Sequence, residues 1–229
     1  MDLSASLSRI KAYHTRNGLW ATVRRAALAV RRALFLNRMV LFYGDLSHTD
    51  VMAPELPAFL KLERKRSAVE LSPEDLDKMT SFWNPRLARR NMKERFGKGA
   101  SLWLIRSDGD LAGYGWTLRG NTIEPHYFPL GQDDVHFFDF HVFPEYRGRR
   151  INPHLVTQIF RHLAAEKAGR AFIEAAEWNR PQLSSLTKTP FSRLGCASKL
   201  SVLGRTVVSW TRTERSSVDG LLPLEASRN

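Results

Sequence analysis

The chain has 229 residues, 43% hydrophobic and 25% charged, a composition typical of a soluble globular protein with one substantial core and an extension. Its formal net charge of +12 at pH 7 favours negatively charged partners, such as a phosphorylated ligand, nucleic acid or an anionic membrane face. The single cysteine, Cys196, excludes an internal disulfide and a cysteine-based zinc cluster, and no run of about 18 apolar residues predicts a transmembrane helix.

Residues 1–57 are predicted to form a basic helical extension. Apolar residues at helical spacing give it one apolar face, while arginines gather on another; these apolar residues are Trp20, Val23, Ala27, Val30 and Leu34. Two interpretations stay open: the helix lies on an anionic membrane surface, or it packs on the protein's own domain with a solvated basic face. Arginines interrupt the apolar stretch too often for a secretory signal. We therefore expect a cytoplasmic protein, peripheral to the inner face of the membrane under the first interpretation.

Capping residues and prolines define the next predicted elements. Residues 59–71 have β-capable side chains among charges and are expected to hold the first strand. Ser72 followed by Pro73 predicts the start of a helix, because serine caps a helix and proline fits its first position. This helix runs towards Phe96, and Pro85 should break or kink it.

A hairpin and a strand–helix–strand unit are predicted in the middle of the chain. Residues 101–106 and 111–119 flank an Asp-Gly-Asp turn and predict a β-hairpin. A strand at residues 135–142 and a helix at 153–167 follow, and residues 171–176 predict a buried strand.

The last predicted elements are a short helix at residues 180–188 and a second hairpin, formed by residues 197–203 and 205–211. Residues 213–229 are polar, with little to pack, and predict a flexible tail.

An anion-binding site is predicted between the central strand and the following helix. The chain passes there from an apolar run through the turn Pro-Glu-Tyr-Arg-Gly-Arg-Arg into a helix whose first turn carries Pro153. The first amides of a helix lack intrahelical acceptors, and the helix dipole favours negative charge at this end. Because arginines surround these amides, we expect a phosphorylated ligand here.

This segment resembles the acyl-CoA-binding motif of the GNAT superfamily of N-acyltransferases, a strand followed by an Arg/Gln-x-x-Gly-x-Gly/Ala turn and a helix. Val142 closes the strand, and Arg147 takes the first motif position. The two motif glycines fall on Arg150 and Asn152, which are departures, although Gly148 remains in the turn.

The resemblance implies an α/β (α+β) fold in which a mixed β-sheet is flanked by helices on both faces. It covers residues 59–210, so we expect a GNAT-like acyltransferase domain at residues 58–212, between the basic extension and the tail. It also implies acetyl-CoA or another acyl-CoA as co-substrate, and no metal. The residues implied to bind it are Phe140 and Val142 for the pantetheine, and Arg147, Gly148, Arg149, Arg150, Ile151 and Asn152 for the diphosphate.

A second family motif is matched in part by residues 179–191. Asn179 matches its first residue and is implied as a further cofactor contact, with a plain turn residue as the alternative. Leu186 stands where the family places its tyrosine acid, so the thiolate would leave unassisted or with help from Ser184 or Ser185.

His136 is the first candidate for the general base. It lies six residues before Val142, where some GNAT lysine acetyltransferases carry a glutamate base, and an imidazole titrates near neutrality. Strand alternation predicts that residues 136, 138, 140 and 142 share one face, towards the pantetheine. The alternative is a histidine that is merely hydrogen-bonded at a strand edge. Glu177 is a second candidate, and Asp139 and His141, on the opposite face, are weaker ones.

Two functions from different classes are weighed. The first is an N-acyltransferase that moves an acyl group from acyl-CoA to a primary amine of a small molecule or peptide, by direct attack in a ternary complex. The second is a non-catalytic basic module that binds nucleic acid or an anionic membrane, which Leu186 and the arginine-rich extension favour. Since the arginines are not interleaved with aromatics in a known nucleic-acid motif, we favour the enzyme.

Overall fold

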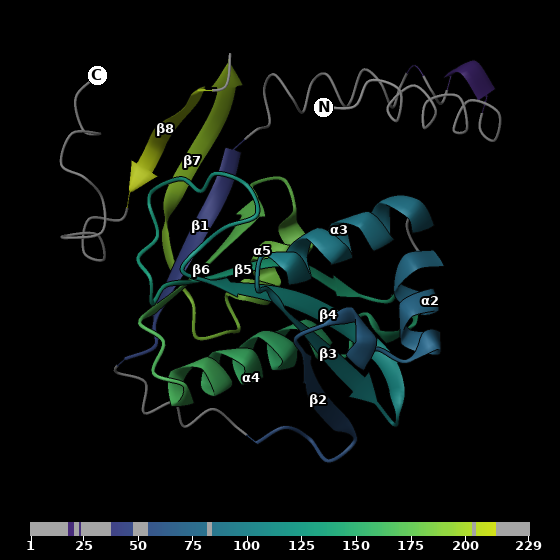
Figure 1. Cartoon of the computed structure of the whole chain (residues 1–229). Coiled ribbons are helices and arrows are strands. Elements are labelled where there is room, and N and C mark those ends of the chain that lie inside the picture. Colours follow the sequence, from purple (N-terminus) through teal and green to yellow (C-terminus); the bar gives the residue numbers. More distant parts are fainter. Residues whose placement is uncertain are drawn as a thin grey trace.

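One mixed β-sheet organises the part of the chain that the structure describes (Figure 1). The computed structural model describes residues 18–20, 23, 38–47, 55–81, 84–202 and 205–213. The strands are β1 (Arg38–Asp45), β2 (Leu60–Lys65), β3 (Ser101–Ser107), β4 (Asp110–Arg119), β5 (Val135–Val142), β6 (Arg170–Ala176), β7 (Ser192–Val202) and β8 (Arg205–Thr213). Their spatial order is β2-β3-β4-β5-β6-β1-β7-β8, and β5 and β6 are the one parallel pair of this described sheet.

Helices cover both faces of this sheet (Figure 1). They are α2 (Pro73–Ser81), α3 (Pro85–Gly97), α4 (Ile151–Ala165) and α5 (Arg180–Leu186), with 3-10 turns η1 (Ala68–Glu70) and η2 (Pro144–Tyr146). Alternate residues of β3 belong to different cores: Trp103 packs with the α4 residue Leu155, whereas Leu102 packs with Met79 of α2 and Met92 of α3. The predicted α/β sheet with helices on both faces is therefore confirmed.

Local sequence signals place several element ends correctly. Pro85 starts α3 instead of kinking one long helix, and the Asn84 side chain accepts a hydrogen bond from the Leu87 amide at 3.1 Å. The β3–β4 turn holds Asp108 at φ 52° and Gly109 at φ 93°, the two left-handed residues that a tight hairpin turn requires.

Strand β1 corrects the expected course of the N-terminal part. The sequence pattern predicts a helical extension that includes residues 38–45, but these residues pair with β6 on one side and β7 on the other. Val40, Leu41 and Phe42 are all buried, which requires a strand covered on both faces and not a helix with one apolar face.

The remainder of the predicted extension is described only in part. Gly18 to Trp20 and Val23 are helical, with Trp20 85% exposed, while Ala27, Val30 and Leu34 lie outside the described residues. The predicted tail also lies outside them from residue 214 onward. Among the described residues, no helix has the length and apolar character needed to cross a membrane.

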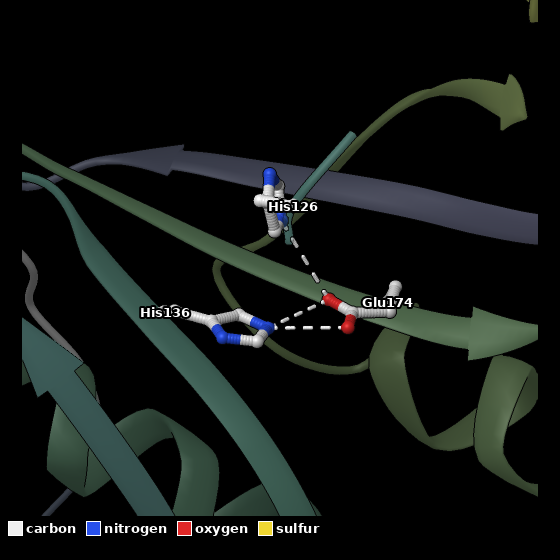
Figure 2. A group of neighbouring side chains, drawn as sticks. All are labelled: His126, His136 and Glu174. Carbon is white, nitrogen blue, oxygen red and sulfur yellow. Dashed lines mark hydrogen bonds and ion pairs between the residues drawn. The ribbon is translucent and has the colours of Figure 1, made fainter. Parts of the chain in front are cut away.

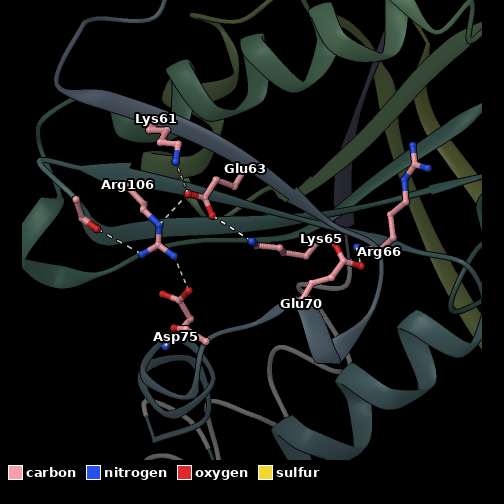
Figure 3. Close-up of polar contacts among 9 residues, drawn as sticks. Lys61, Glu63, Lys65, Arg66, Glu70, Asp75 and Arg106 are labelled. Carbon is pink, nitrogen blue, oxygen red and sulfur yellow. Dashed lines mark hydrogen bonds and ion pairs between the residues drawn. The ribbon is translucent and has the colours of Figure 1, made fainter.

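Charged side chains mark the edge strand β2 (Figure 3). Glu63 lies 3.1 Å from the ammonium nitrogen of Lys61 and 3.2 Å from that of Lys65, and Arg106 of β3 joins Glu63 to Asp75 of α2. Burial alone raises the pKa of Glu63, but hydrogen bonds from the two lysines and the charge of Arg106 outweigh burial and lower it to about 2. Charges on an edge strand also disfavour pairing with another chain.

Candidate functional site

Strands β5 and β6 separate at the centre of the sheet. Their parallel pairing covers Val135 to Phe137 and ends there. Beyond this point the β5–β4 register shifts, and Asp139 adopts a left-handed φ of 51°. A β-bulge of this kind re-aims the side chains that follow it.

The bulge changes which β5 residues share a face. Phe137 and Phe140 stack with ring centroids 6.0 Å apart, and Phe140 and Val142 pack against the core that includes α4. His136 instead stacks on Phe138, with ring centroids 5.3 Å apart, and Phe138 packs against the other core. The prediction that residues 136, 138, 140 and 142 share one face is therefore wrong, because strict alternation ends at Asp139.

A cavity of about 410 Å³ opens where β5 leaves β6. The end of β5, the turn after it, the first turn of α4 and the helix α5 form its walls. The residues that line it are Phe140, His141, Val142, Tyr146, Arg147, Gly148, Arg150, Ile151, Asn152, Pro153, Asn179, Pro181, Gln182, Ser184, Ser185 and Lys188.

Most residues predicted to contact a cofactor meet in this cavity. Those that line it are Phe140, Val142, Arg147, Gly148, Arg150, Ile151, Asn152 and Asn179. Arg149 is the exception, since it lies over the ring of Tyr146, 5.7 Å from its centroid. Tyr146, Gln182 and Lys188 were not singled out from the sequence and also line the cavity.

The turn before α4 presents its backbone to the cavity. Gly148 and Arg150 both adopt left-handed φ angles, 78° and 58°, and Arg150 is the N-cap of α4. Such alternating backbone conformations turn successive amides towards one point and form an anion-binding concavity. The helix begins at Ile151, two residues before its predicted start, so the amides of Ile151 and Asn152 belong to the turn that lacks intrahelical acceptors.

The charge of the cavity is positive. Arg147, Arg150 and Lys188 line it, and within the described part of the chain no acidic residue does. Arg147 is held in place by its Nε, which donates a hydrogen bond to the Val142 carbonyl at 3.1 Å. Burial lowers the pKa of His141, and the charge of Arg147 lowers it further. These charges favour a ligand with several negative charges.

Two amide side chains in the cavity wall are held by hydrogen bonds. Asn152 donates to the Ser185 hydroxyl at 2.8 Å and thereby joins α4 to α5. Asn179 caps α5 and donates to the Gln182 side chain at 2.9 Å. Leu186, at the position of the family's tyrosine acid, is fully buried in the core and does not line the cavity.

A comparison with protein-family models matches residues 68–186, just over half of the chain, to the acetyltransferase (GNAT) family. The chain belongs to the GNAT acetyltransferase family. No curated protein matches it significantly.

Solved structures share the GNAT fold. A tandem GNAT protein from the clavulanic acid biosynthesis pathway is 18% identical with a TM-score of 0.50, over 74% of this chain and 55% of that one. A GNAT-family acetyltransferase from Colwellia psychrerythraea is 10% identical with a TM-score of 0.50, over 68% of this chain and 52% of that one. The matched region thus spans about half of each of those proteins, and the likeness concerns the fold.

The two proposed bases lie outside the cavity of this GNAT domain. His136 is only 6% exposed, and its Nε2 lies 3.0 and 3.1 Å from the Glu174 carboxylate oxygens. Glu177 lies on the surface, 3.5 Å from the Nε atom of Arg38. Of the weaker candidates, Asp139 pairs with Arg95, and His141 lines the cavity.

The surroundings of His136 in the GNAT domain are not signalled by any sequence motif. His126, from the irregular segment between β4 and β5, lies 5.1 Å from it between ring centroids. Burial lowers the pKa of His126 to about 4, so its imidazole is neutral at pH 7. Burial alone raises the pKa of Glu174, but the opposing interactions, of which those with His136 are the largest, outweigh burial and lower it.

Proposed function

We propose that this GNAT protein transfers an acyl group from acyl-CoA to a primary amine. The observation that carries the proposal is the cationic cavity at the N-terminus of α4, where two central strands separate. Family membership supports acetyl-CoA or a related thioester as the co-substrate.

Each part of the thioester has a matching wall. The diphosphate is assigned to the amides of the turn at residues 148–152, with Arg147 and Arg150 beside them. The pantetheine is assigned to the gap between β5 and β6, along Phe140 and Val142, because strand backbone without a partner strand offers hydrogen bonds to an amide-containing chain.

The reaction is a direct attack. The neutral amine nitrogen bonds to the thioester carbonyl carbon, the carbonyl oxygen becomes an oxyanion near the β5 amides, and the carbon–sulfur bond then breaks to release the CoA thiolate. The amine proton passes to water in this scheme, because His136 faces Glu174 on the other side of β5. Since Leu186 is buried, the thiolate takes its proton from solvent or from a hydroxyl group of the cavity wall.

Thermal unfolding in the presence of ligands tests the cofactor assignment. Acetyl-CoA should raise the Tm progressively with concentration, with a stabilisation of about 2.7 kcal/mol when the ligand is a hundredfold above its Kd. Arg147→Ala and Arg150→Ala should each weaken binding about tenfold or more, since each removes a charged contact to phosphate. Arg86→Ala, on the exposed surface of α3, is the matched control and should bind normally.

The same experiment separates the enzyme from a basic binding module. A module that binds nucleic acid or an anionic membrane would show no stabilisation by acetyl-CoA, together with polyanion binding that falls steeply with salt. That pair of results would overturn the proposed function. Acyl transfer to an amine, followed by release of free CoA thiol, would then establish the reaction itself.

A further inference from the structure

A second polar cluster lies outside the cavity, within the sheet itself (Figure 2). His136 comes from β5 and Glu174 from the neighbouring strand β6, while His126 comes from the segment between β4 and β5. Figure 2 shows both imidazole rings directed at the one carboxylate. Three different elements of the chain therefore converge on one point.

The distances within the cluster approach those of a metal site. One ligand atom from each residue lies within 4.8 Å of the others. The His136 Nε2 is 3.0 Å, and the His126 Nε2 3.9 Å, from the same Glu174 oxygen. Ligand atoms around a tetrahedral Zn²⁺ with bonds of about 2.0–2.1 Å lie about 3.3 Å apart. The cluster is therefore wider than a loaded tetrahedral site, and an ion bound there would draw the three ligand atoms closer together.

A hydrogen-bonded pair accounts for only part of the cluster. Nε2 of His136 faces Glu174, but 3.9 Å is too long for a hydrogen bond from His126. Both ring nitrogens of His126 are buried without a hydrogen bond of good geometry in the described part of the chain, although the ring approaches the Phe128 backbone. Buried polar atoms in native proteins are nearly always satisfied, and an ion is one of the partners that can satisfy them.

Aromatic rings pack against the cluster. The His126 ring meets the ring of Phe128 edge-on at 4.7 Å between centroids and lies 6.1 Å from Phe172, and His136 stacks on Phe138. Bringing an ionised carboxylate into such a place is unfavourable unless it is compensated by a positive charge or by hydrogen bonds. A cation held by the two imidazole nitrogens and the carboxylate oxygen is one such compensating charge.

We propose that His126, His136 and Glu174 bind a divalent transition-metal ion of the zinc class. Two imidazole nitrogens and one carboxylate oxygen suit Zn²⁺ and its neighbours, whereas Mg²⁺ and Ca²⁺ prefer all-oxygen sites. The ion ties the segment that carries His126 to the two central strands, with water as its fourth ligand. This assignment differs from the sequence-based expectation of no metal. The sequence does not show that the three residues meet, because they lie on three different elements.

Direct metal binding tests the site. The tag-free full-length chain, stripped with a chelator, is titrated with Zn²⁺ against a chromophoric competitor, and Co²⁺ is used as a spectroscopic probe. We expect one equivalent of Zn²⁺ and the intense visible bands of a low-coordinate Co²⁺ site. His126→Gln and Glu174→Gln should each weaken Zn²⁺ binding by more than about tenfold, because each removes one ligand. His154→Gln on α4, outside the cluster, should leave the affinity unchanged.

The outcomes are decisive in both directions. If the wild-type chain binds no stoichiometric Zn²⁺, or if the two ligand variants bind as tightly as the wild type, the cluster is only a hydrogen-bonded pair and the proposal is wrong. The wild-type measurement stands even where a variant fails to fold, which circular dichroism will reveal. Because the cluster does not line the cavity, acetyl-CoA stabilisation is measured separately, and a negative result for Zn²⁺ leaves the proposed function intact.

Discussion

The rings of Phe137 and Phe140 are stacked at an interplanar angle of 9°, although the two residues are three positions apart in the same strand. In a regular strand two such residues point to opposite faces. The left-handed Asp139 inserts the extra residue that brings them to the same face. As a result Phe140 lines the cavity, while His136 remains on the far side of β5.

Gly115 on β4 makes room for this arrangement. A Cβ atom at this position would overlap the Phe140 ring. We expect Gly115→Ala to displace the ring, to lower the free energy of unfolding by about 1–3 kcal/mol and to weaken binding of acetyl-CoA. Chemical denaturation and ligand-dependent Tm shifts measure the two effects.

Gly97→Ala is the matched control for Gly115→Ala. Gly97 ends α3, and a Cβ there meets open space, so the unfolding free energy should stay within about 0.5 kcal/mol of wild type or rise. Equal stability and equal cofactor affinity in both variants would show that Phe140 is not held by close contact with β4.

The candidate site was foreseen in part. The arginine-rich turn and the helix start after β5 are local signals, which is why residues 147–152 were predicted as a group and meet at one cavity. The bulge at Asp139 is a backbone property that side-chain periodicity does not reveal. The prediction that His136 lies on the same face as Phe140 was therefore wrong. Glu174 lies in a buried strand without any motif, and only the sheet register sets it beside His136.

Arg150 combines a charge with an unfavourable backbone angle, and the two contributions are separable. Its φ of 58° is tolerated by glycine without the penalty of about 1–2 kcal/mol that other residues incur. We expect Arg150→Gly to be more stable than Arg150→Ala by about 1 kcal/mol in chemical denaturation. Both variants should bind acetyl-CoA more weakly than wild type, because both lack the guanidinium. Equal stability of the two variants would contradict a left-handed residue at the start of α4.

Most of the fold could be predicted from the sequence because helix caps and tight turns depend on only a few neighbouring residues. Pro85 and the Asp108-Gly109 turn act within a few residues, and the predicted elements around them are confirmed. Strand β1 was missed, since its insertion between β6 and β7 depends on partners more than a hundred residues away.

Leu41 provides a test of that insertion. It is 1% exposed at the centre of β1 and packs with Phe172 and Leu194. We expect Leu41→Ala to lower the free energy of unfolding by about 2–5 kcal/mol, since it leaves a cavity in a covered face of the sheet. Val207→Ala, at a position 62% exposed on β8, should change it by less than about 0.5 kcal/mol. If Leu41→Ala lowered the free energy of unfolding as little as Val207→Ala, the burial of β1 in the core would be contradicted.

Glu63 gives the protein a predictable response to acid. Its pKa is about 2 in the folded chain and about 4.5 when unfolded, so the unfolded state binds more protons between these values. The contribution of Glu63 to stability is therefore complete above pH 4.5 and is lost as the pH falls through 2.

Glu63→Gln should lower the free energy of unfolding by about 1 kcal/mol at pH 7 and flatten its decline between pH 4.5 and 2, as urea denaturation at stepped pH will show. Because Lys61, which pairs with the carboxylate, is largely exposed to solvent, 1 M salt should reduce the difference at pH 7. A difference between variant and wild type that did not change with pH would mean that the shape of the side chain matters there, and not its charge.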